Sequence, residues 1–84
     1  MIDRADAEAV IYRVAVSAFA YYPDKATKEP GYTVDEDVEW SLEPVSALDS
    51  AQTAELEDRI REAITSLACD RQGFIQYVLG LADA

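Results

Sequence analysis

The sequence predicts a small, mainly helical α+β domain that spans residues 1–84. Two long stretches carry apolar residues at the spacing of a helix, whereas a middle stretch alternates apolar and acidic residues with period two. Pro and Gly residues separate these stretches. We therefore expect two or three helices (about 3–22, 50–69 and, as the third, 71–82) and a strand-like or hairpin segment at about 32–43.

The first element is expected to be a helix over residues 3–22. Asp3 is a candidate N-cap, and Asp6 in the first turn suits the positive end of the helix dipole. Most other positions are apolar, which is typical of a helix buried on most sides. The β-branched residues in 10–22 leave a strand as the competing interpretation. Pro23 is expected to end the element in either case, and residues 23–31 to form an exposed loop.

Residues 32–43 have the alternation of a half-buried strand with an acidic outer face. The run Asp35-Glu36-Asp37 is poor strand material, so a break or tight turn there is the alternative. The apolar side of the alternation is formed by Tyr32, Val34, Val38, Trp40 and Leu42.

The second helix is expected to begin near Ser50, because Asp49 and Gln52 have the spacing of a capping box. Gly73 is a candidate end for this helix. Alternatively, Asp70 caps a third helix at 71–82, and a strand over 74–81 is the competing interpretation. The apolar stripe of the second helix consists of Leu56, Ile60, Ala63, Ile64 and Leu67.

The charge of the chain is concentrated in its middle. The thirty residues from Glu29 to Asp58 contain no Lys or Arg and ten of the 17 carboxylates, and the formal net charge is −10. Half of the residues are hydrophobic, which predicts a folded chain rather than a disordered one. Such a field attracts basic partners and disfavours direct binding to nucleic acid or to anionic membranes.

Several functional classes are disfavoured by composition. The chain has no His, so nucleophile systems that rely on His are excluded, and the single Cys69 is expected to be a small core residue on the second helix. A calcium loop starting at Asp35 would require Gly at the position of Trp40 and Glu at that of Ser46. We expect no enzymatic activity, cofactor or metal. Without a signal-like or membrane-spanning stretch, we expect a cytoplasmic protein.

The candidate partner-binding residues lie on the acidic face of the expected strand and among nearby aromatic residues. Alternate strand residues advance about 6.6–6.8 Å, close to two phosphates of one nucleic-acid strand. The row could therefore present a phosphate-like array to Lys and Arg of a partner. Tyr and Trp are typical anchors of interfaces. The candidates are Asp35, Glu36, Asp37, Glu39, Glu43, Tyr21, Tyr22 and Trp40.

These residues favour a non-enzymatic acidic inhibitor that occupies a basic, nucleic-acid-handling surface of a partner protein. An acidic face that only maintains solubility is the simpler interpretation. The absence of Lys and Arg over thirty residues favours the inhibitor, because a merely soluble surface intersperses both signs. A different hypothesis is an assembly subunit that forms a homodimer through its apolar N-terminal helix.

The triplet Tyr21-Tyr22-Pro23, with the length and acidity of the chain, resembles colicin immunity proteins, which are small acidic four-helix inhibitors with a Tyr-Tyr-Pro stretch. The likeness covers three residues. They close the first element here but lie later in that family, so its function is not carried over. In size and charge the chain is also similar to phage anti-restriction and anti-CRISPR proteins that imitate nucleic acid, a likeness of class without a shared motif.

Overall fold

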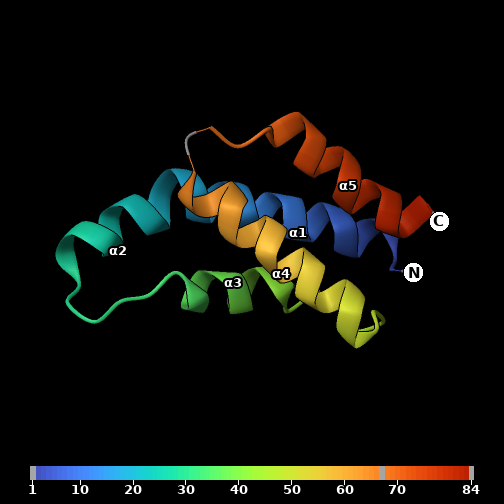
Figure 1. The fold of residues 1–84 in the computed structure, drawn as a ribbon, viewed down its shortest axis with the longest axis horizontal. Coiled ribbons are helices and arrows are strands. Elements are labelled where there is room, and N and C mark those ends of the chain that lie inside the picture. Colours follow the sequence, from blue (N-terminus) through green and yellow to red (C-terminus); the bar gives the residue numbers. More distant parts are fainter. Residues whose placement is uncertain (1, 67, 84) are drawn as a thin grey trace.

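The computed structural model describes residues 2–66 and 68–83, and every regular element within them is a helix. Helix α1 (Arg4–Val16) lies along the middle of the molecule, with α5 (Arg71–Asp83) on one side and α3 (Asp35–Leu42) on the other (Figure 1). Helix α4 (Ser50–Thr65) packs obliquely against α1, and α2 (Tyr22–Lys28) extends beyond the bundle. The fold therefore surrounds α1 with the other helices.

The hydrophobic core lies between α1 and the helices around it. Ala7, Val10 and Val14 recur at helical spacing on the buried side of α1. At the start of the chain, the Ile2 N–H donates to the Leu81 carbonyl at 3.3 Å, which holds the beginning of α1 beside α5. The other helices supply Val38, Leu56, Ile60, Ala63, Ile64, Phe74 and Val78 to this core.

The first helix is longer than expected. Helix is correct for 10–22, but Pro23 does not end it, because α1 continues through a π turn, η1 (Ser17–Tyr21), into α2. A proline ring inside a helix clashes with the carbonyl four residues earlier, here that of Phe19. The wider π turn ends two residues before Pro23, and the Tyr22 N–H donates to the Ser17 carbonyl five residues back. The exposed loop expected at 23–31 is thus wrong for residues 23–28, which form most of α2.

The strand or hairpin expected at 32–43 is wrong, and the domain is all-helical rather than α+β. Val34 and Val38 are four residues apart, a spacing that places side chains on one side of a strand and also on one face of a helix. The buried residues of α3 include Val38 and Ser41, three positions apart, which is helical spacing. The acids that are poor in a strand occupy the first turn of α3, where negative charge is favourable.

The two later helices begin where capping residues predict. The Gln52 N–H donates to Asp49 Oδ1 at 2.8 Å, and the Asp49 N–H donates to Gln52 Oε1 at 3.3 Å, which completes the capping box of α4. The Gly73 N–H donates to Asp70 Oδ1 at 2.9 Å, so Asp70 caps α5. The helix interpretation of 71–82 is therefore correct, and the strand over 74–81 is wrong.

The end of α4 differs from the expectation. The helix stops at Thr65, and Ser66 is extended, so Ser66, Ala68 and Cys69 do not belong to it. Leu67, expected on the apolar stripe, lies outside the described residues. Cys69 is half-buried in the connection to α5 and packs at the edge of the core, rather than on the second helix as expected.

Candidate partner-binding surface around α3

The four acids predicted to form one row (Asp35, Asp37, Glu39 and Glu43) point in several directions, because α3 is a helix. Successive residues of a helix advance about 1.5 Å and rotate around its axis, so the match to phosphate spacing does not hold. Glu36 and Glu39 are exposed, as are Asp35 and Glu43. Asp37 is only 3% exposed. The surface therefore has to be rebuilt from the contacts of each carboxylate.

Asp37 is a structural residue. Its carboxylate accepts a hydrogen bond from the hydroxyl of Tyr32, five residues earlier. Burial raises the pKa of Tyr32, and the bond to Asp37 raises it further. This contact fastens the connection between α2 and α3 onto the first turn of α3, so Asp37 does not face a partner.

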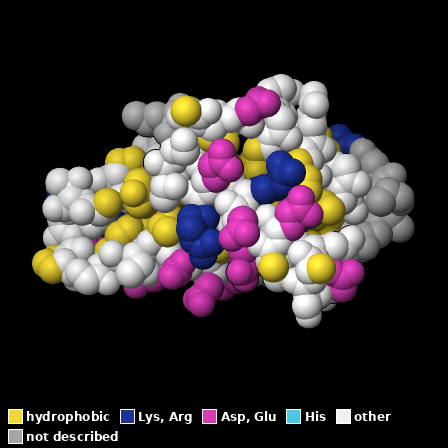
Figure 2. Space-filling view, viewed as in Figure 1, with side chains coloured by type: hydrophobic (Ala, Val, Ile, Leu, Met, Phe, Trp, Pro, Cys, Tyr) yellow, Lys and Arg dark blue, Asp and Glu magenta, His cyan; other side chains and the backbone are white. Residues whose placement is uncertain are grey.

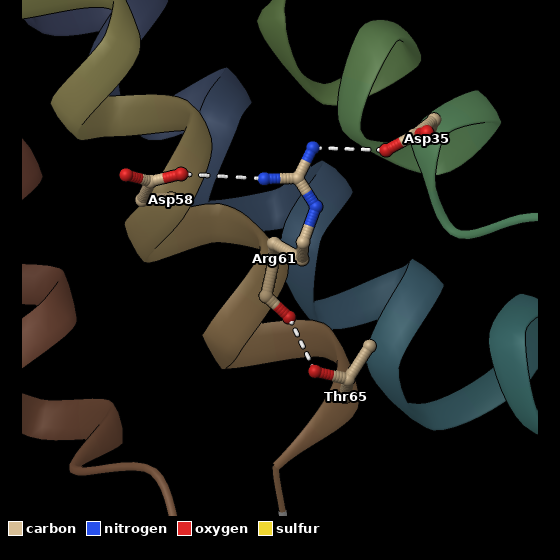
Figure 3. A network of polar contacts seen from close by, with 4 residues as sticks. All are labelled: Asp35, Asp58, Arg61 and Thr65. Carbon is tan, nitrogen blue, oxygen red and sulfur yellow. Dashed lines mark hydrogen bonds and ion pairs between the residues drawn. The ribbon is translucent and has the colours of Figure 1, made fainter.

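Asp35 joins α3 to α4 through Arg61 (Figure 3). Arg61 Nη2 donates to Asp35 Oδ1 at 2.8 Å, while Nη1 donates to Asp58 Oδ1 at 3.3 Å on its own helix. The hydroxyl of Thr65 donates to the Arg61 carbonyl at 2.7 Å. The hydrogen bond to Asp35 raises the pKa of Arg61, so this guanidinium stays charged and neutralises part of the α3 carboxylates.

Glu43 is engaged by Arg13 of α1 at the opposite end of α3. Arg13 Nη1 lies 2.7 Å from Glu43 Oε2 and donates to the Trp40 carbonyl, also at 2.7 Å. The guanidinium carbon is 4.9 Å from the centre of the Trp40 ring. A cation at the last carbonyls of a helix is favourable, so Arg13 fixes the end of α3 to α1.

The remaining bases of the chain are also engaged internally. Lys25 lies over the rings of Tyr21 and Tyr32, and Arg71 donates to the Ala63 carbonyl and lies over Phe19. The other bases pair with carboxylates four residues away on their own helices, as Arg4–Glu8, Lys28–Asp24 and Arg59–Glu55. Little positive charge is thus left for the acids around α3.

Four carboxylates on the α3 side of the molecule make no ion pair or hydrogen bond with any described residue. We call them the acidic edge: Glu29, Glu36, Glu39 and Glu57. Glu39 and Glu57 line the same shallow hollow between α3 and α4, beside Arg61. Figure 2 shows acidic side chains gathered along this side of the molecule. The acidic edge shares only Glu36 and Glu39 with the five predicted acids and includes Glu57 of α4.

The predicted aromatic anchors lie beside this edge but differ in exposure. Tyr21 is 43% exposed, and its ring centre is 5.6 Å from that of Trp40, with the planes at 54°. Tyr22 is half-buried and packs against the core, and its ring centre lies 6.3 Å from that of Tyr32. Lys25 also lies over the rings of Tyr21 and Tyr32, a contact that the sequence does not predict. This contact forms because the chain turns back from α2 to α3, so it depends on the fold and not on a local sequence pattern.

Among residues 2–66 and 68–83, no helix has the length and apolar character needed to cross a lipid bilayer. Within the same ranges, no three Cys, Asp or Glu side chains are grouped so that they could hold a metal ion. The chain matches no protein-family model, no curated protein sequence and no solved structure. The fold and the chemistry of its surface are therefore the basis for a functional proposal.

Proposed function

We propose that the protein is a non-enzymatic acidic binding protein that uses the acidic edge to occupy a basic surface of a partner protein. One observation carries the proposal: the bases of the chain are engaged internally, whereas the carboxylates of Glu29, Glu36, Glu39 and Glu57 have no ion-pair or hydrogen-bond partner among residues 2–66 and 68–83. A field of one sign speeds encounter with a partner of the opposite sign and disfavours other partners.

The class of partner follows from the chemistry of this edge. Proteins that handle nucleic acids carry clustered Lys and Arg, because these residues bind phosphates. An acidic protein that covers such a cluster would block access of the nucleic acid, so we place the partner in this class. The free thiol of Cys69 is compatible with a reducing compartment such as the cytoplasm.

The test compares two variants with the same net charge. Glu36→Lys with Glu39→Lys alters the acidic edge, and Glu8→Lys with Glu62→Lys alters exposed acids of α1 and α4. Each Glu→Lys substitution changes the charge by +2, so the formal net charge goes from −10 to −6 in both variants. The probe is a synthetic peptide of alternating arginine and serine, and its affinity is measured by fluorescence anisotropy at low and high salt.

We expect the α3 variant to lose about tenfold in affinity and the control variant about threefold, since only the former alters the proposed contact surface. The difference should shrink as salt is added, because the Debye length falls to about 10 Å at 0.1 M. Equal losses in the two variants would show that only net charge matters and would contradict the proposal.

A second candidate is self-association, which is favoured by exposed aromatic residues on the first helix. The homodimer hypothesis assumes that the first helix is left uncovered, but α3, α4 and α5 pack against most of α1. However, Tyr12 and Phe19 are 68% and 69% exposed and seven residues apart, and Phe19 borders an apolar hollow of about 110 Å³. Sedimentation equilibrium tests this candidate: Phe19→Ser should weaken any dimer, and a strict monomer at high concentration would exclude it.

A further inference from the structure

A shallow hollow of about 320 Å³ adjoins the acidic edge, and its chemistry suits one particular side chain. It is lined by Tyr21, Lys25, Glu36, Asp37 and Trp40. Tyr21 and Trp40 form an aromatic side, with ring centres 5.6 Å apart. Glu36 contributes an exposed carboxylate, whereas the carboxylate of Asp37 is already bonded to Tyr32. The hollow thus combines aromatic faces with negative charge.

Two cations of the chain itself already lie against these aromatic rings. Arg13 lies over Trp40 and is held in place by Glu43 and by the Trp40 carbonyl. Lys25 Nζ is 5.5 Å from the centre of the Tyr21 ring and 5.7 Å from that of Tyr32. In the described part of the chain, no carboxylate lies within ion-pair distance of Lys25. Its ammonium group is therefore held by the rings alone, and such contacts are weak at exposed sites.

We infer that this hollow receives one arginine side chain of the basic partner, which displaces Lys25 from the aromatic rings. The inference rests on the proposed function and specifies how the partner is recognised. A guanidinium group is planar, stacks on aromatic faces and pairs with carboxylates through two hydrogen bonds. It can stack against Tyr21 and bond Glu36 at once, whereas an ammonium group offers no planar face. Lys25 then competes with the partner's arginine for the same aromatic rings.

The first test removes the competitor. Lys25→Met and Lys28→Met each remove one positive charge from α2, so both increase the general attraction for a basic peptide by a similar amount. Only Lys25 lies over the rings, whereas Lys28 pairs with Asp24 at 2.8 Å. With the arginine–serine peptide as probe, Lys25→Met should increase affinity at least about threefold more than Lys28→Met. Equal effects of the two variants would overturn the inference.

The second test removes an aromatic face. Tyr21→Leu should weaken binding of the arginine–serine peptide about three- to tenfold, and binding of a lysine–serine peptide less. Tyr12→Leu, at an exposed position of α1, should leave both affinities unchanged. Circular dichroism establishes that both variants are folded. If Tyr21→Leu behaves as Tyr12→Leu does, the hollow is not the arginine site, while the charge variants of α3 still decide the proposed function separately.

Discussion

At the scale of single residues, the side chains that stabilise α3 are the ones a sequence pattern would assign to its surface. Asp37 is nearly inaccessible to solvent, and its carboxylate depends on the hydroxyl of Tyr32. A buried carboxylate without a hydrogen-bond donor is costly, because water no longer solvates it. The Tyr32–Asp37 pair therefore couples the connection at 29–34 to the stability of the domain.

Replacing Tyr32 with Phe should lower the free energy of unfolding by about 1–3 kcal/mol, since the buried carboxylate loses its donor. Urea unfolding at neutral pH measures this, with Tyr12→Phe as an exposed control that should change little. A loss of less than about 0.5 kcal/mol in Tyr32→Phe would show that water replaces the hydroxyl without cost.

The Tyr32–Asp37 pair should also change how the stability of the fold depends on alkaline pH. Burial and the bond to Asp37 raise the pKa of Tyr32 above the value of about 10 in the unfolded chain. Above pH 10 the folded state therefore holds more protons than the unfolded state, and its stability falls as the pH rises. The wild type should lose more stability between pH 9 and about 11.5 than Tyr32→Phe does. Burial raises the pKa of Tyr77 too, but that contribution is common to both proteins. Parallel pH profiles for the two would contradict the prediction.

At the scale of elements, α5 contains two glycines in very different surroundings. A Cβ added at Gly80 would meet no atom within 4 Å, whereas one at Gly73 would lie 2.5 Å from Asp70 Oδ2. That oxygen belongs to the carboxylate that caps the helix. Glycine at 73 therefore leaves room for the cap, and glycine at 80 has no such reason.

Gly80→Ala should raise the free energy of unfolding by about 0.5–1 kcal/mol, because alanine loses less conformational freedom in a helix. Gly73→Ala should gain nothing or destabilise, because the added methyl group displaces the Asp70 side chain and its cap is worth about 1 kcal/mol. Thermal unfolding of the two variants measures the difference. Equal stabilisation by both would show that the cap of α5 contributes little.

The elements also show where sequence reasoning succeeds and where it fails. The capping residues Asp49 and Asp70 predict the starts of α4 and α5, because a cap is a local interaction between residues three positions apart. The strand at 32–43 was predicted wrongly because Val34 and Val38 satisfy both periods, and the burial of Asp37 contradicts its place on the polar side of the alternation. The acids at 35–37, which suit the first turn of a helix, were the signal for the correct structure.

The candidate site was only partly predictable for a different reason. The exposure of Glu39 follows from the alternation in the sequence, whereas Glu36 falls on the apolar side of that alternation and is nevertheless exposed. The pairing of Asp35 with Arg61 and of Glu43 with Arg13 joins residues 26 and 30 positions apart. Such pairs depend on how the helices pack, and no local pattern encodes them. They decide which acids remain available to a partner.

At the scale of the whole molecule, a net charge of −10 is carried by a body of about 39 × 23 × 20 Å. Charges on opposite sides are then separated by little more than one Debye length or less at 0.01 M salt, where the Debye length is about 30 Å, so they repel one another across the molecule. The ion pairs of Arg13 and Arg61 offset a small part of this repulsion, because exposed pairs contribute little. Repulsion should therefore dominate the response of the fold to salt.

Raising NaCl from about 10 mM to about 0.5 M should increase the unfolding temperature, because screening weakens repulsion among the 17 carboxylates. Calorimetry in a buffer of constant pH measures this. Sucrose serves as the control, because it is excluded from the protein surface but is uncharged and does not screen the carboxylates. A fall in the unfolding temperature with salt would mean that the ion pairs outweigh the repulsion.

The π turn between α1 and α2 has a consequence for the length of the chain. A π turn accommodates about one residue more than an α-helical turn of the same height. A related chain one residue shorter between Ser17 and Tyr21 could therefore keep both helices in place, but only if it also lacked Pro23, whose ring needs the wider turn. The length of this segment and the proline should thus vary together. A chain that changed one without the other would lose the continuous helical path from Arg4 to Lys28 that places Tyr21 and Lys25 beside α3.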